Sequence, residues 1–438
     1  MSIYLENAAA IADQLCEDAH VANGRANWVS RSVPYAQRRP DGKSPDLLPA
    51  LEPLNPSFYS GTAGIAVFLA RLHQYTKDPR HARMAKAAIR HSIEHAFDVV
   101  PASERPMPIG TSWQKGFYIG SMGIAWATEE VGRALGSDDI RREGRSLFAR
   151  VASEPSATEF DLMFGVAGSV AASLSLAEQG YQGAQEFAVA MGDWLLSNAR
   201  KEEQGWSWLG YGSSPNAPAL LGLSHGTSGV AVVMQRLYEA TKDERYLEAV
   251  EQSIAYERAK FDAQEGNWPH FGIPAQQDGR PGFFSTWCHG APGVGLARAF
   301  LYPRMRDARM LDEIRDAWKN TVRSVELDLE RPGRDFQYCH GVGGNTECLW
   351  EMASVLDPAK GAKLARDVAQ YGVERYGKGA AGKWGGWAGW PTAVSHRYHP
   401  PLITGLAGVG YFLLRVHDPA RVPTVLLPAV SMDYAAAR

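Results

Sequence analysis

The sequence predicts an all-α protein, an α/α toroid in which seven outer helices surround seven inner helices. A Gly-x-x-Gly signature occurs seven times along the 438-residue chain, and an apolar helical run follows each copy. Copies of one signature at near-regular spacing indicate an array of similar units. We number these turns one to seven in chain order. They lie at Gly61/Gly64, Gly120/Gly123, Gly165/Gly168, Gly226/Gly229, Gly290/Gly293, Gly341/Gly344 and Gly405/Gly408.

Two kinds of helix alternate between the turns. Runs that follow a turn directly, such as 65–72 and 230–237, are apolar all round, which indicates that they are buried. The segments that come next, such as 81–97, 243–260 and 307–327, carry charged residues along one face. One wet face is typical of a helix that covers a core. Each unit is therefore predicted to pair an inner helix with an outer helix.

The ends of the chain close the ring in this prediction. Residues 3–20 form an amphipathic pattern that reads as an outer helix without an earlier partner, and the inner helix after Gly408 lacks a later one. Pairing these two helices completes the toroid. Because all inner helices then run in the same direction, their N-termini and the glycine turns meet at one end. Residues just before the turns should face the mouth of the central cavity.

We expect residues 1–438 to form a single domain, since no stretch resembles a linker between two cores. Residues 21–57 contain several prolines and arginines without a clear period, and they are predicted to form a long irregular loop. This loop is either a cover for the site or a surface excursion. Short hairpins are expected around 206–208 and 383–390.

Composition excludes several classes of protein. The net charge of −3 and the pI of about 6.5 provide no electrostatic footprint for nucleic acid. No apolar run is long enough for a transmembrane segment, and residues 1–6 lack the features of a signal peptide, so a cytoplasmic location is predicted. Four cysteines in a long cytoplasmic chain favour metal or redox chemistry over a disulfide framework.

The residues that precede turns three to six form the candidate site. Two thiols and one imidazole suit zinc, and three protein ligands leave its fourth position open. Cys288, Cys339 and His340 are the predicted ligands. His289 precedes turn five as His340 precedes turn six, so either imidazole is a candidate ligand and the other a supporting or acid–base group. Alternatively, the cysteines merely pack in the core.

His225, directly before turn four, is the candidate catalytic acid or base, because histidine titrates near neutral pH. Asp161, which precedes turn three, is its candidate orienting partner; the alternative for Asp161 is a helix N-cap. A structural role is the alternative for His225. Trp287 and Tyr338 are expected to be walls of the pocket, with Tyr338 also kept as a candidate supporting group.

The amino-acid sequences around these turns resemble those of the lanthionine synthetase C-like family. The matching pieces are Ser224-His225-Gly226, Trp287-Cys288-His289-Gly290-Ala291-Pro292-Gly293 and Cys339-His340-Gly341. The resemblance, closest to the stand-alone lanthipeptide cyclases, implies a sevenfold toroid with one zinc ion held by Cys288, Cys339 and His340.

The resemblance also implies roles for further residues. It makes His225 and Asp161 the acid–base pair. Family cyclases have an arginine shortly before the first zinc cysteine; here Phe284 stands four residues before Cys288, and the nearest arginine is Arg280. Arg280 is therefore a candidate supporting group.

The expected function is that of a zinc-dependent cyclase. Such an enzyme adds cysteine thiols to dehydroalanine or dehydrobutyrine and forms thioether rings in a dehydrated precursor peptide. A dehydratase or kinase/lyase would be its partner. Two alternatives stay open: addition of glutathione or another thiol to dehydrated proteins, and a non-catalytic peptide-binding toroid. A glycosidase would require two carboxylates across the cavity, and only Asp161 lies at a turn. A prenyltransferase would require a basic cluster, which the turns lack.

Overall fold

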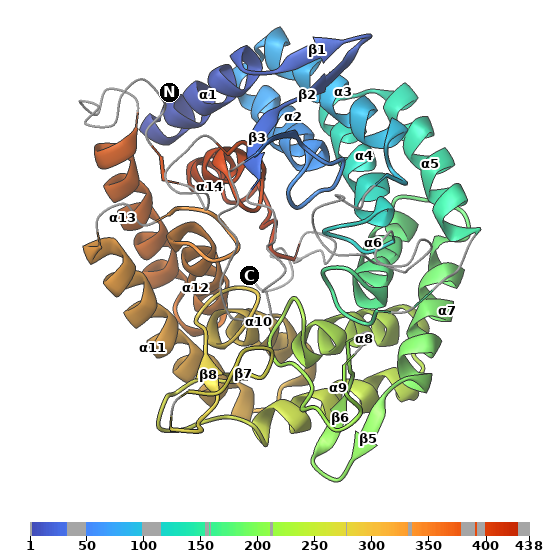
Figure 1. Ribbon diagram of the computed structural model, residues 1–438, viewed down its shortest axis with the longest axis vertical. Coiled ribbons are helices and arrows are strands. Elements are labelled where there is room, and N and C mark those ends of the chain that lie inside the picture. The colour runs from blue at the N-terminus through green and yellow to red at the C-terminus, as the bar shows by residue number, and fades with distance from the viewer. Residues whose placement is uncertain are drawn as a thin grey trace.

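The computed structural model shows two concentric rings of helices, as the sequence predicts (Figure 1). It describes residues 2–32, 50–98, 115–153, 157, 159–210, 213–276, 278–331, 335–377, 390–391 and 399–427. The inner helices are α2 (Thr62–Thr76), α4 (Ser121–Leu135), α6 (Val166–Glu178), α8 (Thr227–Thr241), α10 (Ala291–Met305), α12 (Val342–Leu356) and α14 (Leu406–His417). The outer helices are α1 (Ile3–Glu17), α3 (Pro79–Glu94), α5 (Asp138–Ala152), α7 (Ala184–Ser197), α9 (Glu244–Arg258), α11 (Arg309–Glu330) and α13 (Pro358–Tyr376).

The ring closes where the two ends of the chain meet. Each inner helix packs against the outer helix that follows it, whereas α14 packs against α1, the first helix of the chain. Helix α14 also contacts α2 and α12, so the inner ring is continuous. Figure 1 shows α1 and α14 side by side at the blue and red ends of the chain. The predicted pairing of the unpartnered first and last helices is confirmed.

The described residues include four short antiparallel strand pairs beside the helices. They are β1 (His20–Ala22) with β2 (Arg25–Asn27), β3 (Val29–Ser32) with β4 (Ala50–Pro53), β5 (Arg200–Glu202) with β6 (Gly205–Ser207), and β7 (Pro269–His270) with β8 (Gly282–Phe283). The prediction of an irregular loop over 21–57 was therefore wrong for the parts that form β1 to β4. These strands are too short to show an alternating pattern. The hairpin expected near 206–208 is confirmed, while 383–389 and 33–49 lie outside the described residues.

Close backbone approach explains the second glycine of the signature. A Cβ atom on Gly229 would collide with the carbonyl oxygen of Leu223, six residues earlier, and one on Gly293 would collide with that of Trp287. Any side chain here would push the turn away from its helix. Seven glycines open the Gly-x-x-Gly signatures. Of these, only Gly290 has a positive φ, which is 83°. The other six have extended backbones.

Backbone hydrogen bonds connect most of the turns along the rim of the ring. Each amide donates to a carbonyl on the next turn: Tyr338 to Ile403 (3.0 Å), Ile403 to Tyr59 (3.1 Å), Tyr59 to Tyr118 (2.9 Å), Tyr118 to Met163 (3.2 Å) and Met163 to Ser224 (3.2 Å). This series places the N-termini of the inner helices at one end, as predicted. Their partial positive charges favour anions there.

Turn five is the exception on the rim. Among the described residues, no backbone hydrogen bond joins it to turn four or turn six. Side chains connect it instead: Ser224 Oγ donates to Cys288 O (3.4 Å), and Asn345 Nδ2 donates to Ser285 O (2.9 Å). The turn that carries Cys288 is therefore attached less directly than its neighbours.

The segment after α14 fills the centre of the ring (Figure 1). Val422, Val425 and Leu426 are buried there, and the Tyr118 hydroxyl donates to the Leu426 carbonyl (2.7 Å). Arg415 of α14 is buried as well and pairs with carboxylates of α12. These contacts pack the described part of this segment against the inner helices. None of the described helices is both long and apolar enough to cross a membrane.

Candidate metal centre and active site

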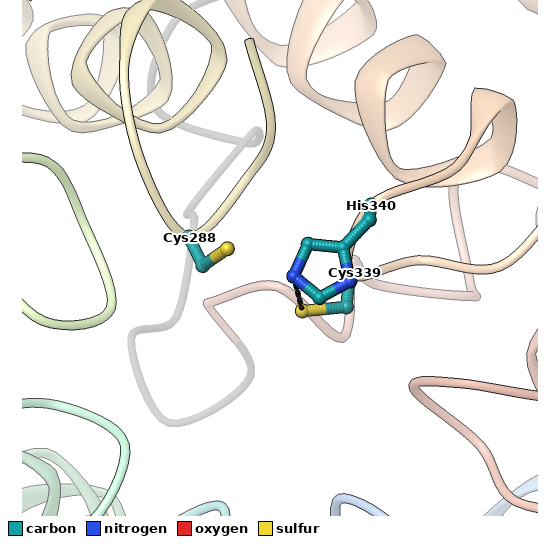
Figure 2. Close-up of side chains that lie close together, drawn as sticks. All are labelled: Cys288, Cys339 and His340. Carbon is teal, nitrogen blue, oxygen red and sulfur yellow. Dashed lines mark hydrogen bonds between the residues drawn. The ribbon is translucent and has the colours of Figure 1, made fainter. Parts of the chain in front are cut away.

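Cys288, Cys339 and His340 meet at the rim, on the two neighbouring turns that precede α10 and α12. Figure 2 shows the Cys288 sulfur directed toward the His340 ring and the Cys339 sulfur. One ligand atom from each residue lies within 4.8 Å of the others, and Cys339 Sγ is 3.3 Å from His340 Nε2. Both cysteines are buried, whereas His340 is exposed. Of the two imidazoles that the sequence left open, His340 is the one in this group.

The two thiols differ in acidity because they act on one another. The Cys339 thiol and His340 hold the pKa of Cys288 well below its usual range. Burial and the Cys288 thiolate raise the pKa of Cys339 well above its own. The Thr286 hydroxyl lies 3.2 Å from Cys288 Sγ. A thiolate is the form of cysteine that binds metals.

This donor set fits zinc. Two sulfurs and one imidazole nitrogen form a common zinc site, and three protein ligands leave one position open. A hydroxyl beside one sulfur provides the outer support that metal ligands usually have. Cys348, in contrast, is buried within α12, where burial raises its pKa well above its usual range.

His225 and Asp161 form a close pair beside this group. His225 Nδ1 donates to Asp161 Oδ2 at 2.7 Å, and Asp161 Oδ1 accepts from the amides of Phe164 (2.7 Å) and Gly165 (3.1 Å). The alternative of a helix N-cap for Asp161 is wrong, because Gly165 is the N-cap of α6. The Asp161 carboxylate instead holds the turn before α6 and the His225 ring. Burial acts to lower the pKa of His225, but the hydrogen bond and charge of Asp161 outweigh it and raise the pKa.

A buried carboxylate that sequence reasoning missed holds the His225 turn in place. Glu257 of α9 accepts from the amides of Gly222 (3.1 Å) and Ser228 (3.1 Å), which flank His225 on both sides. Its other oxygen accepts from Arg298 of α10 at 2.9 Å. Both side chains of this pair are fully buried. The pair thereby links the His225 turn to the helix that follows Cys288.

His289 lies between two other imidazoles. Its ring stacks on His225, with centroids 5.2 Å apart and planes 20° apart. On the other side, the His270 ring of β7 lies 3.8 Å away. His289 Nδ1 is buried and has no hydrogen-bond partner in the described part of the chain. Burial lowers the pKa of His289 to about 3, so the ring is neutral near pH 7.

The remaining candidates lie apart from this group. Arg280 pairs with Asp278 (2.8 Å) and Glu265 (3.2 Å) at the surface, and within the described ranges these two carboxylates are its ion-pair partners. A supporting role for Arg280 stays a prediction from the sequence. Tyr338 is buried, and its hydroxyl donates to Glu347 (3.1 Å) in the core. The Tyr338 side chain therefore packs in the core, against α12.

His270 was also missed from the sequence. It stands in the segment between an outer helix and turn five, where neither the glycine signature nor helical periodicity marks a position. A histidine within about twenty residues of the Cys-His-Gly turn was the only available signal. Glu257 gave none, because a single glutamate on the charged helix α9 resembles its exposed neighbours.

Comparison with known proteins gives related sequences and folds. The family model for lanthionine synthetase C-like proteins matches residues 52–427. A lacticin 481/lactococcin biosynthesis protein, LcnDR2, of Lactococcus lactis subsp. lactis is 26% identical over 221 residues. That match covers 47% of this chain and only 22% of the relative, so the chain spans far less than the relative's full length.

Among solved structures, nisin cyclase superposes with a TM-score of 0.58 at 15% identity, covering 86% of this chain and 92% of the other. This likeness shows the fold, an α/α toroid. A GH76 α-mannanase of Bacteroides thetaiotaomicron has a TM-score of 0.49 at 10% identity, covering 96% of each chain, which is too weak to carry an argument. The family model matches most of the described chain, including every turn of the ring, and the chain belongs to the lanthionine synthetase C-like family.

Proposed function

We propose that this protein is a zinc-dependent cyclase that forms thioether rings in a dehydrated peptide. The observation that carries the proposal is the group of Cys288, Cys339 and His340 next to the His225–Asp161 pair. Membership of the family and the similarity to a lacticin biosynthesis protein support it.

In this proposal Cys288, Cys339 and His340 hold one zinc ion. When bound, zinc supplies an open position for a substrate thiol and lowers the pKa of that thiol toward neutral pH. Cys288 and Cys339 are buried, and His340 is the exposed member of the three. The helix N-termini around the rim favour the negative charge that develops there.

His225 donates the proton that the α-carbon of the dehydrated residue gains. Addition of sulfur to the β-carbon breaks the double bond and leaves an enolate, which needs one proton at the α-carbon. Asp161 raises the pKa of His225 against the effect of burial, which favours the protonated imidazole that can donate this proton. Asp161 also fixes the ring, since His225 Nδ1 is bound to it at 2.7 Å.

The test uses the purified, zinc-loaded protein and a peptide with one dehydroalanine and one cysteine. The proposal predicts loss of the free thiol at unchanged peptide mass. A peptide that lacks cysteine, supplied with glutathione, tests the thiol-addition alternative: a mass increase by one glutathione in this arm, with no ring in the first, would favour that alternative. Binding without reaction in both arms would favour a peptide-binding toroid.

Three further expectations belong to this proposal. The substrate is a dehydrated precursor peptide, and a dehydratase or kinase/lyase prepares it. A cytoplasmic location stays a prediction from the sequence. So does the organisation of residues 1–438 as one domain.

A further inference from the structure

Five rings stand in a row beside the metal-ligand group. In order they are Phe164, His225, His289, His270 and Phe284, with neighbouring centroids 5.4, 5.2, 3.8 and (for His270 and Phe284) 5.0 Å apart. Three of the rings are histidines, and each comes from a different part of the chain. The proposed function uses only His225.

Hydrogen bonds fix opposite protonation states of the Nδ1 atoms of His225 and His270. His225 Nδ1 faces the Asp161 carboxylate, which only accepts, so Nδ1 carries a proton. His270 Nδ1 faces the Gly272 amide at 2.9 Å, which only donates, so this nitrogen carries none. The proton of a neutral His270 ring must therefore be on Nε2. No group in the described part of the chain forms a hydrogen bond with His270 Nε2, which leaves this N–H available.

The environment of His270 favours its neutral form and places it near the proposed ligand Cys288. The residue is 9% exposed. Burial lowers the pKa of His270, and the Cys288 thiolate opposes that shift, as it opposes the effect of burial at His225. Both rings thus lie within electrostatic reach of Cys288. The Phe284 ring packs edge-on against His270 at 75° and holds it from the other side.

We propose that His270 is a further catalytic residue, whose Nε2–H donates a hydrogen bond to the carbonyl oxygen of the dehydrated residue that receives the thiol. This inference rests on the proposed function. As the sulfur–β-carbon bond forms, the electron pair of the carbon–carbon double bond moves toward the α-carbon and this oxygen. The thiol releases one proton and the α-carbon gains one, so the peptide keeps its mass. His270 retains its own proton throughout.

A fixed donor aimed at a developing oxyanion contributes strongly to catalysis, because the donor needs no reorientation during the reaction. Arg280, the nearest arginine before turn five, pairs at the surface and cannot fill this role. Phe284 stands closer to turn five but offers no donor. In this proposal His270 Nε2 serves the oxygen and His225 serves the α-carbon, from the two sides of His289.

Two substitutions separate hydrogen bonding from packing. His270→Asn places an oxygen near the Nδ1 position and can still accept from Gly272, but it has no donor at the Nε2 position. His270→Gln reaches that position with an N–H. In the zinc-loaded protein we expect His270→Asn to lower kcat by about 10²-fold, with KM and zinc content little changed. His270→Gln should recover part of the loss. An unchanged kcat in His270→Asn, or equal losses in both variants, would overturn the proposal.

A second measurement does not depend on turnover. Long-range ¹H–¹⁵N spectra of ¹⁵N-histidine-labelled protein report the tautomer of each ring, and the His270→Gln spectrum identifies the signals of residue 270. We expect a proton on Nε2, and a shift of that nitrogen when a dehydroalanine peptide without cysteine is added. A proton on Nδ1, or no response to the peptide, would overturn the inference. Absence of ring formation by the wild-type protein, with the expected spectra, would instead contradict the proposed function.

Discussion

Asp161→Asn isolates the electrostatic part of the His225–Asp161 pair. The asparagine oxygen can still accept from the Phe164 and Gly165 amides, which bond Asp161 Oδ1 at 2.7 and 3.1 Å, so the turn keeps its cap. The amide nitrogen that replaces Oδ2 cannot accept from His225 Nδ1. The substitution thus removes one hydrogen bond of 2.7 Å and one negative charge.

The size of the effect follows from that bond. A hydrogen bond to a charged group contributes about 1.5–3 kcal/mol, which corresponds to about 10- to 150-fold in rate when it is lost at the transition state. The pH dependence should also change. His225 must be protonated to donate to the α-carbon, so the rate falls as the pH rises through its pKa, which Asp161 raises. Without the carboxylate that pKa falls, and the loss of rate moves to lower pH.

The assay is ring formation in the dehydrated peptide, followed as loss of free thiol between pH 5 and 10. Asp357→Asn is the matched control, because Asp357 caps α13 through its bond from the Lys360 amide (3.1 Å) and is remote in sequence from the turn that carries His225. We expect the control to keep the wild-type rate and profile. If Asp161→Asn also kept both, the role assigned to the pair would be wrong.

Three more predictions concern the metal group and its supports. Removal of zinc by a chelator should speed amide exchange at residues 285–290 more than at the other turns, since no backbone hydrogen bond between described residues joins turn five to its neighbours on the rim. Equal protection with and without metal would contradict this. Cys288→Ala should lose stoichiometric zinc and ring formation together, whereas Cys348→Ala, in the core of α12, should retain both. Glu257→Ala leaves the buried Arg298 with one carboxylate fewer, so we expect a loss of about 3–5 kcal/mol in the free energy of unfolding, measured by denaturation. A loss below 1 kcal/mol in the free energy of unfolding would show that the Glu257–Arg298 pair contributes little to stability.

The glycine signature made the ring predictable from the sequence. Seven copies required seven similar units, and the unpartnered first and last helices required closure, as α1 and α14 confirm. The same signature predicted that Cys288, Cys339 and His340 lie close together, because residues before equivalent turns must come together at one end. It could not choose between His289 and His340. That choice depends on the side-chain directions within two turns that differ at Gly290, where φ is 83°.

Other parts of the site depend on packing that no local pattern records. Glu257 reaches the His225 turn from an outer helix, and its burial depends on Arg298 from the next inner helix. His270 joins the row of rings because β7 and β8 pair across a loop. The sequence also suggested Arg280 by proximity along the chain, but nearby carboxylates hold it at the surface. Closeness in sequence to turn five does not by itself place Arg280 beside Cys288, because Arg280 lies between the paired strands β7 and β8.

The central claim is that Cys288, Cys339 and His340 hold one zinc ion with a position left open. X-ray absorption at the zinc edge, on protein whose metal content has been measured, tests it most directly. We expect one zinc per chain with two sulfurs at about 2.3 Å and two nitrogen or oxygen neighbours at about 2.0–2.1 Å. Protein without bound zinc, or zinc surrounded by nitrogen and oxygen alone, would contradict the account.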